Sequence, residues 1–367
     1  MSQPAPTSVL PPRLFRGRLS VEAQTALLAP VLALLVAVLA ANLLVLAYGE
    51  SPAAILGLLL AGTWGSAYGI GQVLFKATPL ILTGIAVALP FRAGLFNIGA
   101  EGQAVVGALA TGVVGASLPA GTPWPVAIPL AAGAGFGAGA LWGGLPGWLR
   151  GRFGAHEVIL TIMLNFVALA LANYVTVSGF ALPETLHGPP IVGGAELSRL
   201  SRFFPALHGS AASTAFFGAL GVALLSWWLL FRTVFGYEVR VLGGSLAAAV
   251  GSGIPPARIM TLVMAIAGGC AGLVGTSSVQ GYKHYYEDGF SGGIGFMGIA
   301  VALLGRNHPL GLILAALLFG TLSQGGLAIN ARVPKELVEI LQAVIILAVI
   351  ASSQEVARVL RRTGGGR

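Results

Sequence analysis

Long apolar runs, separated by short polar segments rich in glycine and proline, make up most of this chain. A helix needs about 20 apolar residues to cross a bilayer. The runs that meet or approach that length cover residues 26–47, 68–90, 98–117, 126–149, 157–177, 214–231, 259–280, 292–305, 309–329 and 337–352. The pattern predicts an all-α membrane protein with about ten transmembrane helices.

Two apolar runs are too short or too interrupted to be ordinary spans. Residues 51–65 are apolar but punctuated by glycine, which favours a helix that lies at the outer interface or re-enters the membrane. Residues 292–305 suit a broken or half helix. Glycine-rich segments open the runs at 98 and 292, which the expected topology orients in opposite directions. This arrangement is what an inverted repeat predicts, with the pathway near its midplane.

The composition excludes an ordinary soluble domain. The 367 residues are 56% hydrophobic and 9% charged, with a mean hydropathy of +0.87. The 54 glycines suit close helix packing in lipid, and the single cysteine excludes an internal disulfide. We expect a membrane permease domain over 25–353 between two basic cytoplasmic tails, 1–24 and 354–367. The apolar run 26–47 is too long for the apolar core of a signal peptide, so we expect it to be retained as the first span.

The basic residues indicate the orientation of the chain. With the N-terminus inside, 14 arginines fall on the cytoplasmic side and 5 arginines and lysines fall outside, leaving Lys76 within a span. Positive residues favour cytoplasmic loops, so both termini are expected inside. The net charge of +8 is explained by this bias, and we expect no nucleic-acid partner.

The segment 94–103, Gly-Leu-Phe-Asn-Ile-Gly-Ala-Glu-Gly-Gln, places polar groups between two apolar runs. Bilayer hydrocarbon cannot solvate a carboxylate, so Asn97 and Glu101 must face protein or a watery cavity. Asn97 is expected to cap the following helix, with Glu101 one turn later on the same face and Gln103 pointing elsewhere. A structural role in holding an interrupted helix and a role in contacting substrate are both open.

Several other side chains have two readings. Glu157 suits the inner interface near Arg150, while Asn165, two turns later, could bond another helix or a polar ligand. Phe96 and Phe296 could stack on a passing base or fill space. The five histidines show no metal-ligand spacing, no nucleophile set appears, and no lysine follows a glycine as an ATP-binding phosphate loop requires. We expect no metal, no cofactor and no enzymatic activity.

The inner loop 233–256 contains a short helix with clear punctuation. Ser245 can cap it, residues 246–250 form it, glycine can end it, and Pro255 with Pro256 prevents its continuation. Two helical turns are not stable alone in water, so this helix needs a surface. It is either a connector on the protein's own inner face or a coupling element for a separate subunit.

The motifs together resemble the permeases of ATP-binding-cassette importers, in the branch of ribose, branched-chain amino-acid and nucleoside permeases. They are Thr78-Pro-Leu-Ile-Leu-Thr-Gly, the 94–103 segment, His156-Glu-Val-Ile-Leu-Thr-Ile-Met-Leu-Asn, the 233–254 pattern, and Gly295-Phe-Met-Gly-Ile-Ala-Val-Ala-Leu-Leu-Gly. Phe-Asn-Ile-Gly-Ala-Glu-Gly-Gln at 96–103 is similar to nucleoside and simple-sugar permeases rather than ribose permeases. Ser245 stands where the family pattern has Asn, which keeps the capping chemistry.

The resemblance implies a pathway subunit of a nucleoside importer in a prokaryotic inner membrane. Its implied partners are ABC ATPase subunits, a second permease that is often a different chain, and an extracytoplasmic binding protein. Pathway candidates are Phe96, Asn97, Glu101, Gln103, Asn165 and Phe296; coupling candidates are Gly236, Arg240, Gly243, Ser245, Ala247, Ala248 and Gly253. The alternatives are a sugar permease, or an ion-coupled secondary transporter that uses Glu101.

Overall fold

The computed structural model describes residues 35–36, 38–334, 336–344 and 347–348. The expected tails 1–24 and 354–367 lie outside the described residues, as does most of the first apolar run. The described residues form helices and loops, with two isolated β-bridges as their only strand-like pairing. The main helices are α2 (Pro52–Thr63), α3 (Ala67–Phe91), α4 (Ala100–Ser117), α5 (Trp124–Phe153), α6 (Glu157–Val175), α7 (Ala215–Arg232), α8 (Val234–Gly244), α9 (Leu246–Gly251), α10 (Pro256–Gly272), α11 (Ile294–Leu304) and α12 (Pro309–Ile329).

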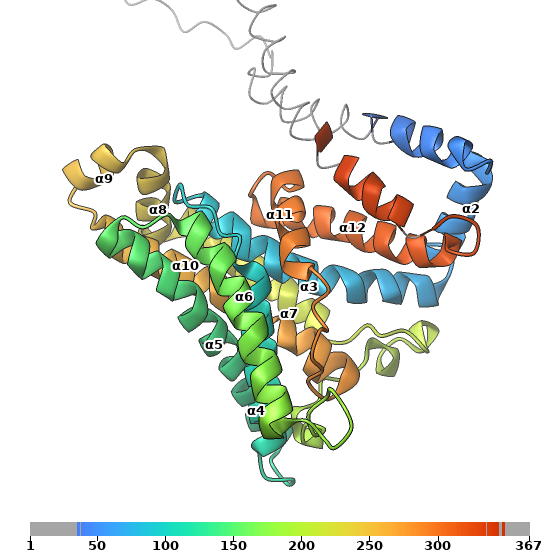
Figure 1. Cartoon of the computed structure of the whole chain (residues 1–367), viewed down its shortest axis with the longest axis horizontal. Coiled ribbons are helices and arrows are strands. Elements are labelled where there is room, and N and C mark those ends of the chain that lie inside the picture. The colour runs from blue at the N-terminus through green and yellow to red at the C-terminus, as the bar shows by residue number, and fades with distance from the viewer. Residues whose placement is uncertain (1–34, 37, 335, 345–346, 349–367) are drawn as a thin grey trace, which may run out of the picture.

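Helix α3 is the centre of the bundle and is buried along most of its length. It packs against α7, α10, α11 and α12 (Figure 1). Ser66 caps its N-terminus by accepting a hydrogen bond from the Gly69 N–H at 3.0 Å. Because α3 contacts helices from both halves of the chain, it positions everything around it.

A second group of helices, α4, α5, α6 and α10, runs side by side (Figure 1). The crossing of α5 and α10 depends on facing glycines: a Cβ added to Gly139 or Gly268 would overlap a backbone oxygen of the other helix, and Gly272 meets Gly135 in the same way. Small residues allow backbones to approach closely where lipid supplies no hydrophobic driving force. Close helix contact thus explains the glycines at this crossing.

Six described helices are long and apolar enough to cross a membrane. They are α3, α5, α6 with its π-helical end, α7, α10 with η5 (Thr276–Lys283), and α12. Helix 38–47 and α2 would add a seventh as a broken pair bent by 113°, which fits the expected interfacial or re-entrant segment. Helix α4 falls outside this set because its glycines and polar residues lower its hydropathy, and α11 is a short apolar helix as expected.

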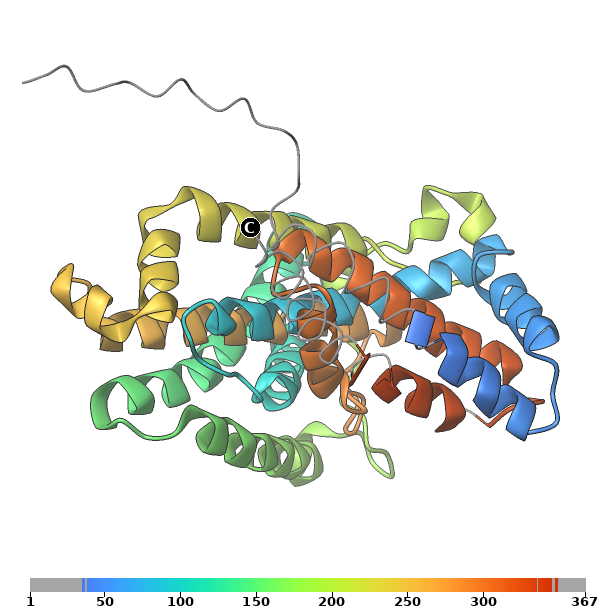
Figure 2. The same cartoon turned by 90° about the horizontal axis from the view of Figure 1, so that it is seen from above.

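Helix ends agree with the sequence expectations except where a helix continues beyond its apolar run or changes from α-helix to π-helix. Helix α12 has the expected bounds, whereas α5 continues to Phe153 and ends at Gly154, a left-handed C-cap with φ 68°. Arg150 and Arg152 lie in its last turn, where cations are favourable. The inner loop carries α8 and α9 at one end of the molecule, and α2 lies at the other (Figure 2).

Candidate functional site

The loop between α3 and α4 is built around an amide pair. Asn97 is fully buried; its Nδ2 donates to the Gln103 Oε1 at 3.0 Å, and the Gln103 Nε2 donates to the Asn97 Oδ1 at 3.1 Å. Asn97 also donates to the Ala86 carbonyl at 3.0 Å, which has no helical partner because Pro90 lacks an N–H. The expectation that Gln103 points elsewhere is wrong. The helical spacing did not apply, because Asn97 precedes the helix.

The N-cap of α4 is Gly99 rather than Asn97, which corrects the expected cap. Asn97 lies in the loop two residues before this N-cap, and its Oδ1 accepts a hydrogen bond from the Gly99 N–H at 3.0 Å. With both donors and the carbonyl oxygen of its amide engaged, Asn97 has its hydrogen-bonding capacity filled by protein.

Glu101 joins α4 to α11. Its two oxygens accept hydrogen bonds from the Gly293 N–H at 3.1 Å and the Gly295 N–H at 2.6 Å. These donors lie at the N-terminus of α11, and Gly293, the α11 N-cap, offers no side chain to cap it. A carboxylate is favourable there because it satisfies unpaired N–H groups at the positive end of the helix. Glu101 thus joins the two glycine-rich segments that the sequence suggested as repeat-related.

Asn165 on α6 clamps the start of α4 from the other side. Its Oδ1 accepts from the Gly102 N–H and its Nδ2 donates to the Ile98 carbonyl, both at 2.9 Å. The expected interhelical hydrogen bonding is therefore present. Phe96 lies half-buried in the loop, with its ring edge-on to Phe91 at 6.1 Å. The structure brings Asn97, Glu101, Gln103 and Asn165 together, and their amide and carboxylate groups all contact protein.

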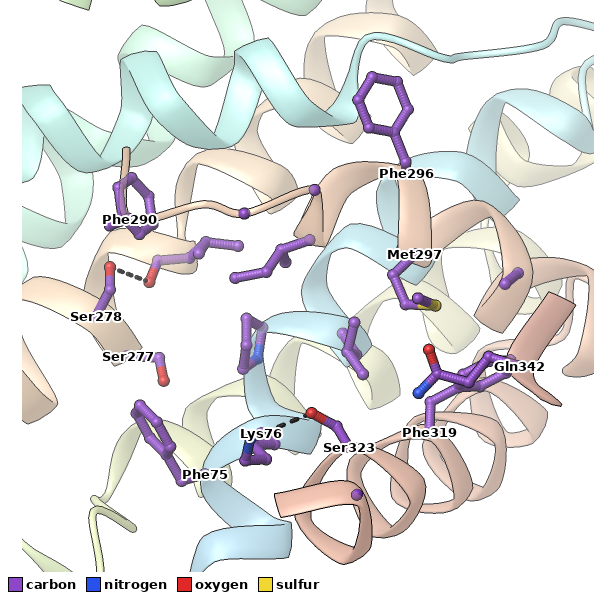
Figure 3. Close-up of a pocket in the computed structure, with 18 of the residues that line it drawn as sticks. Phe75, Lys76, Ser277, Ser278, Phe290, Phe296, Met297, Phe319, Ser323 and Gln342 are labelled. Carbon is purple, nitrogen blue, oxygen red and sulfur yellow. Dashed lines mark hydrogen bonds between the residues drawn. The ribbon is translucent and has the colours of Figure 1, made fainter. Parts of the chain in front are cut away.

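Phe296 lies elsewhere, on the wall of a cavity of about 810 Å³. The cavity lies among α3, η5, α11, α12 and residues 338–343 (Figure 3). Small-molecule sites commonly occupy roughly 300–1,000 Å³. Rings of Phe75, Phe290 and Phe296 line it, with polar groups from Ser277, Ser278, Lys76, Ser323 and Gln342. Gly292 and Gly293 form part of its wall, so Glu101 holds one side of the cavity from behind.

Lys76 is the functional candidate that the sequence reasoning did not select. It lies in the middle of the α3 sequence and lines the cavity, where its Nζ donates to the Ser323 Oγ at 3.1 Å. The signal was present, because an ionisable residue inside a span marks a functional site by default. Phe75 is the neighbour of Lys76 in sequence, and Phe296 was a pathway candidate already. That Phe290 and Phe296 line the same cavity as Lys76 could not be predicted, since they come from a segment more than 200 residues away.

The inner loop forms the two short helices α8 and α9. Ser245 caps α9 by accepting from the Ala248 N–H at 3.2 Å, as the sequence predicted. Thr233 caps α8 by accepting from the Gly236 N–H at 3.1 Å, and α8 was not expected, because the sequence indicated a single short helix in this loop. Gly253 follows α9 with φ +75°, a left-handed conformation that favours glycine. Ala249 is buried. Leu246 and Val250 remain exposed on α9, as does Ala247.

Gly243 places α8 directly against the α3–α4 loop. A Cβ at this position would overlap the Arg92 carbonyl oxygen and lie 3.1 Å from the Gly94 nitrogen. The neighbouring Gly244 has open space at its Cβ position. The backbone of the inner loop therefore touches the segment that leads into Asn97 and Glu101.

A cationic and aromatic cluster surrounds this contact. The guanidinium groups of Arg92 and Arg240 lie 5.9 and 5.5 Å from the Phe231 ring centroid, and the His308 ring stacks on Phe231 at 5.5 Å. Arg92 also donates to the Asn307 carbonyl at 2.9 Å. Burial lowers the pKa of His308 from its usual 6.5, and the nearby Arg92 lowers it further. The imidazole is therefore neutral at neutral pH, and the cluster ties α7 and α8 to the α11–α12 turn.

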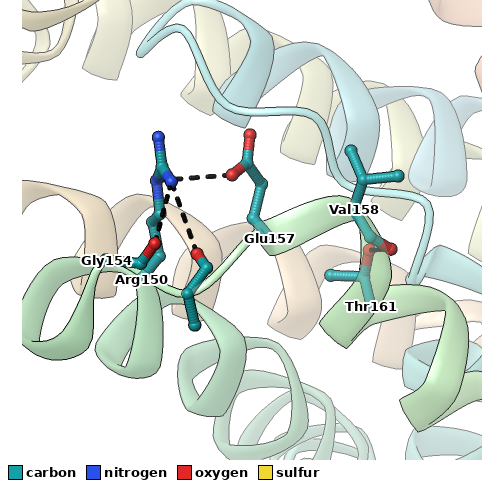
Figure 4. A network of polar contacts seen from close by, with 6 residues as sticks. Arg150, Gly154, Glu157, Val158 and Thr161 are labelled. Atoms are coloured by element: carbon teal, nitrogen blue, oxygen red, sulfur yellow. Dashed lines mark hydrogen bonds and ion pairs between the residues drawn. The ribbon is translucent and has the colours of Figure 1, made fainter.

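Glu157 forms an ion pair with Arg150, with 3.3 Å between the Arg150 Nε and the Glu157 Oε2 (Figure 4). Arg150 also donates to the Gly154 carbonyl at 3.3 Å and the Ala155 carbonyl at 3.4 Å. The expected proximity of Glu157 to Arg150 is confirmed. The pair closes the turn between α5 and α6 and leaves Arg150 engaged.

Residues 69–350 match the family model of the branched-chain amino acid transport system permease component. The chain belongs to this permease family. Over 89% of its length the permease is 36% identical to a guanosine ABC transporter permease protein, NupP, of Bacillus subtilis, covering 93% of that protein. It is 36% identical over 88% of its length to the glucose ABC transporter permease protein TsgB13 of Haloferax volcanii, covering 87% of it.

A nucleoside ABC transporter permease protein, NupB, of Lactococcus lactis is 34% identical over 87% of the permease and 89% of its own length. No solved structure matches the permease significantly. The all-helical fold and the membrane-spanning helices agree with a multi-pass transport permease.

Proposed function

We propose that this permease forms the substrate pathway of an ATP-driven nucleoside importer in the cytoplasmic membrane of a prokaryote, with both termini inside. The observation that carries the proposal is its near full-length similarity to two permeases named for guanosine and nucleoside transport. The chain acts as a transport subunit, and ATP hydrolysis takes place in a separate subunit.

The aromatic cavity is the proposed substrate pathway. A nucleoside offers a flat base, which stacks on aromatic rings, and a ribose, which needs hydrogen bonds. Phe75, Phe290 and Phe296 supply rings, and Lys76 and Gln342 supply polar groups. Of the six pathway candidates chosen from sequence, Phe296 is a cavity-wall residue. Asn97, Glu101, Gln103 and Asn165 are proposed to hold the wall and the α4 start in place.

The inner loop is proposed to dock on the ATPase subunit. Leu246 and Val250 on α9 present an exposed apolar surface, held in shape by the Ser245 cap and the glycine turn. Gly236, Arg240, Gly243, Ala247, Ala248 and Gly253 complete this coupling element. A second, different permease chain and an extracytoplasmic binding protein, as implied for the nucleoside branch, complete the transporter.

Uptake in a strain that lacks this chain tests the proposed substrate. We expect uptake of labelled guanosine to fall to background and to return when the chain is restored, while labelled glucose uptake is unchanged. ATP depletion should abolish the restored uptake, whereas collapse of the proton gradient with ATP maintained should leave it. Loss of guanosine uptake on proton-gradient collapse alone would instead support an ion-coupled secondary transporter.

A glucose permease is the second candidate, because TsgB13 is as similar as NupP in identity. Loss of glucose uptake alone in the same strain would favour it and would keep the permease assignment. A nucleoside carries a flat base that glucose lacks. Because the cavity offers aromatic rings on which a base can stack, we favour the nucleoside as substrate.

Replacement of Lys76 tests the cavity. Lys76→Met keeps the length of the side chain and removes the cation, and we expect the substrate concentration for half-maximal uptake to rise by about tenfold, the effect of losing one charged hydrogen bond. Ser323→Ala removes the resting partner of Lys76 but leaves the cation, so it should change this value far less. Equal kinetics of Lys76→Met and the wild type would contradict a cavity role in substrate binding.

A further inference from the structure

A small groove between α5 and α10 shares no lining residue with the aromatic cavity. It has a volume of about 270 Å³ and is lined by Trp148, Arg152, Ala257, Arg258, Thr261 and Leu262. The two helices meet closely beside it, because a Cβ on Gly151 would lie 2.7 Å from the Ala257 Cα. The close contact holds Arg152 and Arg258, which come from different helices, on one rigid surface.

Both arginines of the groove lack an acidic partner. None of the ion pairs between described residues includes Arg152 or Arg258, and both side chains are exposed. Arg150, two residues from both Trp148 and Arg152, shows the contrast: it pairs with Glu157 and donates to the carbonyls of Gly154 and Ala155 that follow α5. Two guanidinium groups without a carboxylate beside them form a site for an anion, and guanidinium matches the geometry of phosphate.

The surroundings of the arginines are those of a membrane interface. Trp148 and Phe153 are exposed, with their rings edge-on at 5.5 Å. Exposed leucines continue from the groove along the same two helices, Leu145 and Leu141 on α5 and Leu262 on α10. Helix α5, and α10 together with η5, are long enough to span the membrane. Tryptophan is enriched at the level of the lipid headgroups. The exposed leucines farther along the two helices form an apolar surface suited to acyl chains.

We propose that this groove binds the headgroup of an anionic phospholipid. The phosphate lies between Arg152 and Arg258, Trp148 packs against the glycerol region, and the acyl chains follow the leucines. Basic grooves between membrane-spanning helices on the cytoplasmic side are suited to such headgroups. A free phosphate would use the two arginines alone, and a carboxylate of a partner protein would not need the leucine-lined surface.

The site lies next to the inner loop. Arg258 is in the first turn of α10, which begins at Pro256 soon after α9 ends at Gly251. A bound lipid therefore fixes the point where the inner loop returns to the membrane. Occupancy of the groove is expected to support transport without any contact with the substrate.

Lipid retention by the purified transporter tests the proposal. The full chain, with the subunits that copurify, is extracted in detergent and titrated with phosphatidylglycerol or phosphatidylcholine, and the bound lipids are counted by native mass spectrometry. We expect one phosphatidylglycerol to be retained, and its affinity to fall about fivefold for each of Arg152→Gln and Arg258→Gln. Arg202→Gln, an exposed arginine of the outer loop with the same charge loss, is the matched control and should retain the lipid.

Three results would overturn the proposal. They are unchanged phosphatidylglycerol affinity in the double variant, equal retention of phosphatidylcholine, and complete displacement of the lipid by millimolar inorganic phosphate. Unchanged lipid binding together with loss of a copurifying subunit from the double variant would show that the groove takes a protein carboxylate, and it would also overturn the lipid site. A melting curve of each variant confirms that the protein remains folded.

Discussion

Glu101→Ala is expected to abolish transport and to lower the thermal stability of the permease. The substitution removes the acceptor of two N–H groups, the buried one of Gly295 and the part-buried one of Gly293. A buried donor left without a partner costs about 1–3 kcal/mol, so we expect a loss of about that size from the Gly295 N–H and a smaller addition from the Gly293 N–H. Because Gly292 and Gly293 form the cavity wall, the damage reaches the proposed pathway directly.

Glu101→Gln keeps the size of the side chain and removes the carboxylate, so it separates the loss of hydrogen-bond acceptors from the loss of side-chain volume. Glutamine keeps one carbonyl oxygen but turns an amide donor toward a backbone donor, so it is expected to recover stability only in part. Uptake into cells and melting of the detergent-solubilised protein are the two measurements. Glu336→Ala, which removes an exposed carboxylate outside this junction, is the control and should behave as wild type. Wild-type melting and uptake of Glu101→Ala would refute the capping role.

Most helices could be predicted from the sequence because the residues that begin and end them are close to them in the chain. Helix α12 begins at a proline and ends after a run of apolar residues, and the sequence placed both ends where the structure has them. Ser245 and Gly253 likewise marked α9. Errors arose where a polar residue continues a helix, as Arg150 and Arg152 do in α5, because charge alone suggested a loop.

The candidate site was readable only in part, because its decisive contacts join distant segments. Sequence singled out Glu101 as an acidic group that must be satisfied, but its partners lie 192 and 194 residues away. Gln103 was misplaced for a local reason: helical spacing was applied across a loop. Lys76 could be suspected from the sequence alone, whereas the structure was needed to place Phe290 and Phe296 in the same cavity.

Gly243→Ala is expected to uncouple the inner loop from the pathway. The added Cβ would overlap the Arg92 carbonyl, a backbone atom that cannot rotate away, so α8 must move off the α3–α4 loop. Overpacking of this kind costs about 1–3 kcal/mol, and we expect transport to fall by roughly tenfold or more. Membrane insertion should remain normal, because no span is altered.

The neighbouring glycine provides the control for this substitution. Gly244→Ala introduces the same methyl group into open space one residue later, and it should transport as wild type. Arg92 links the disturbed segment to the α11–α12 turn through Asn307, so the displacement is expected to reach the end of α11 as well. The measurement is uptake together with substrate-stimulated ATP hydrolysis by the assembled transporter. Equal activity of the two alanine variants would mean that α8 does not drive the α3–α4 loop, and that ATP-driven motion enters the membrane helices by another contact.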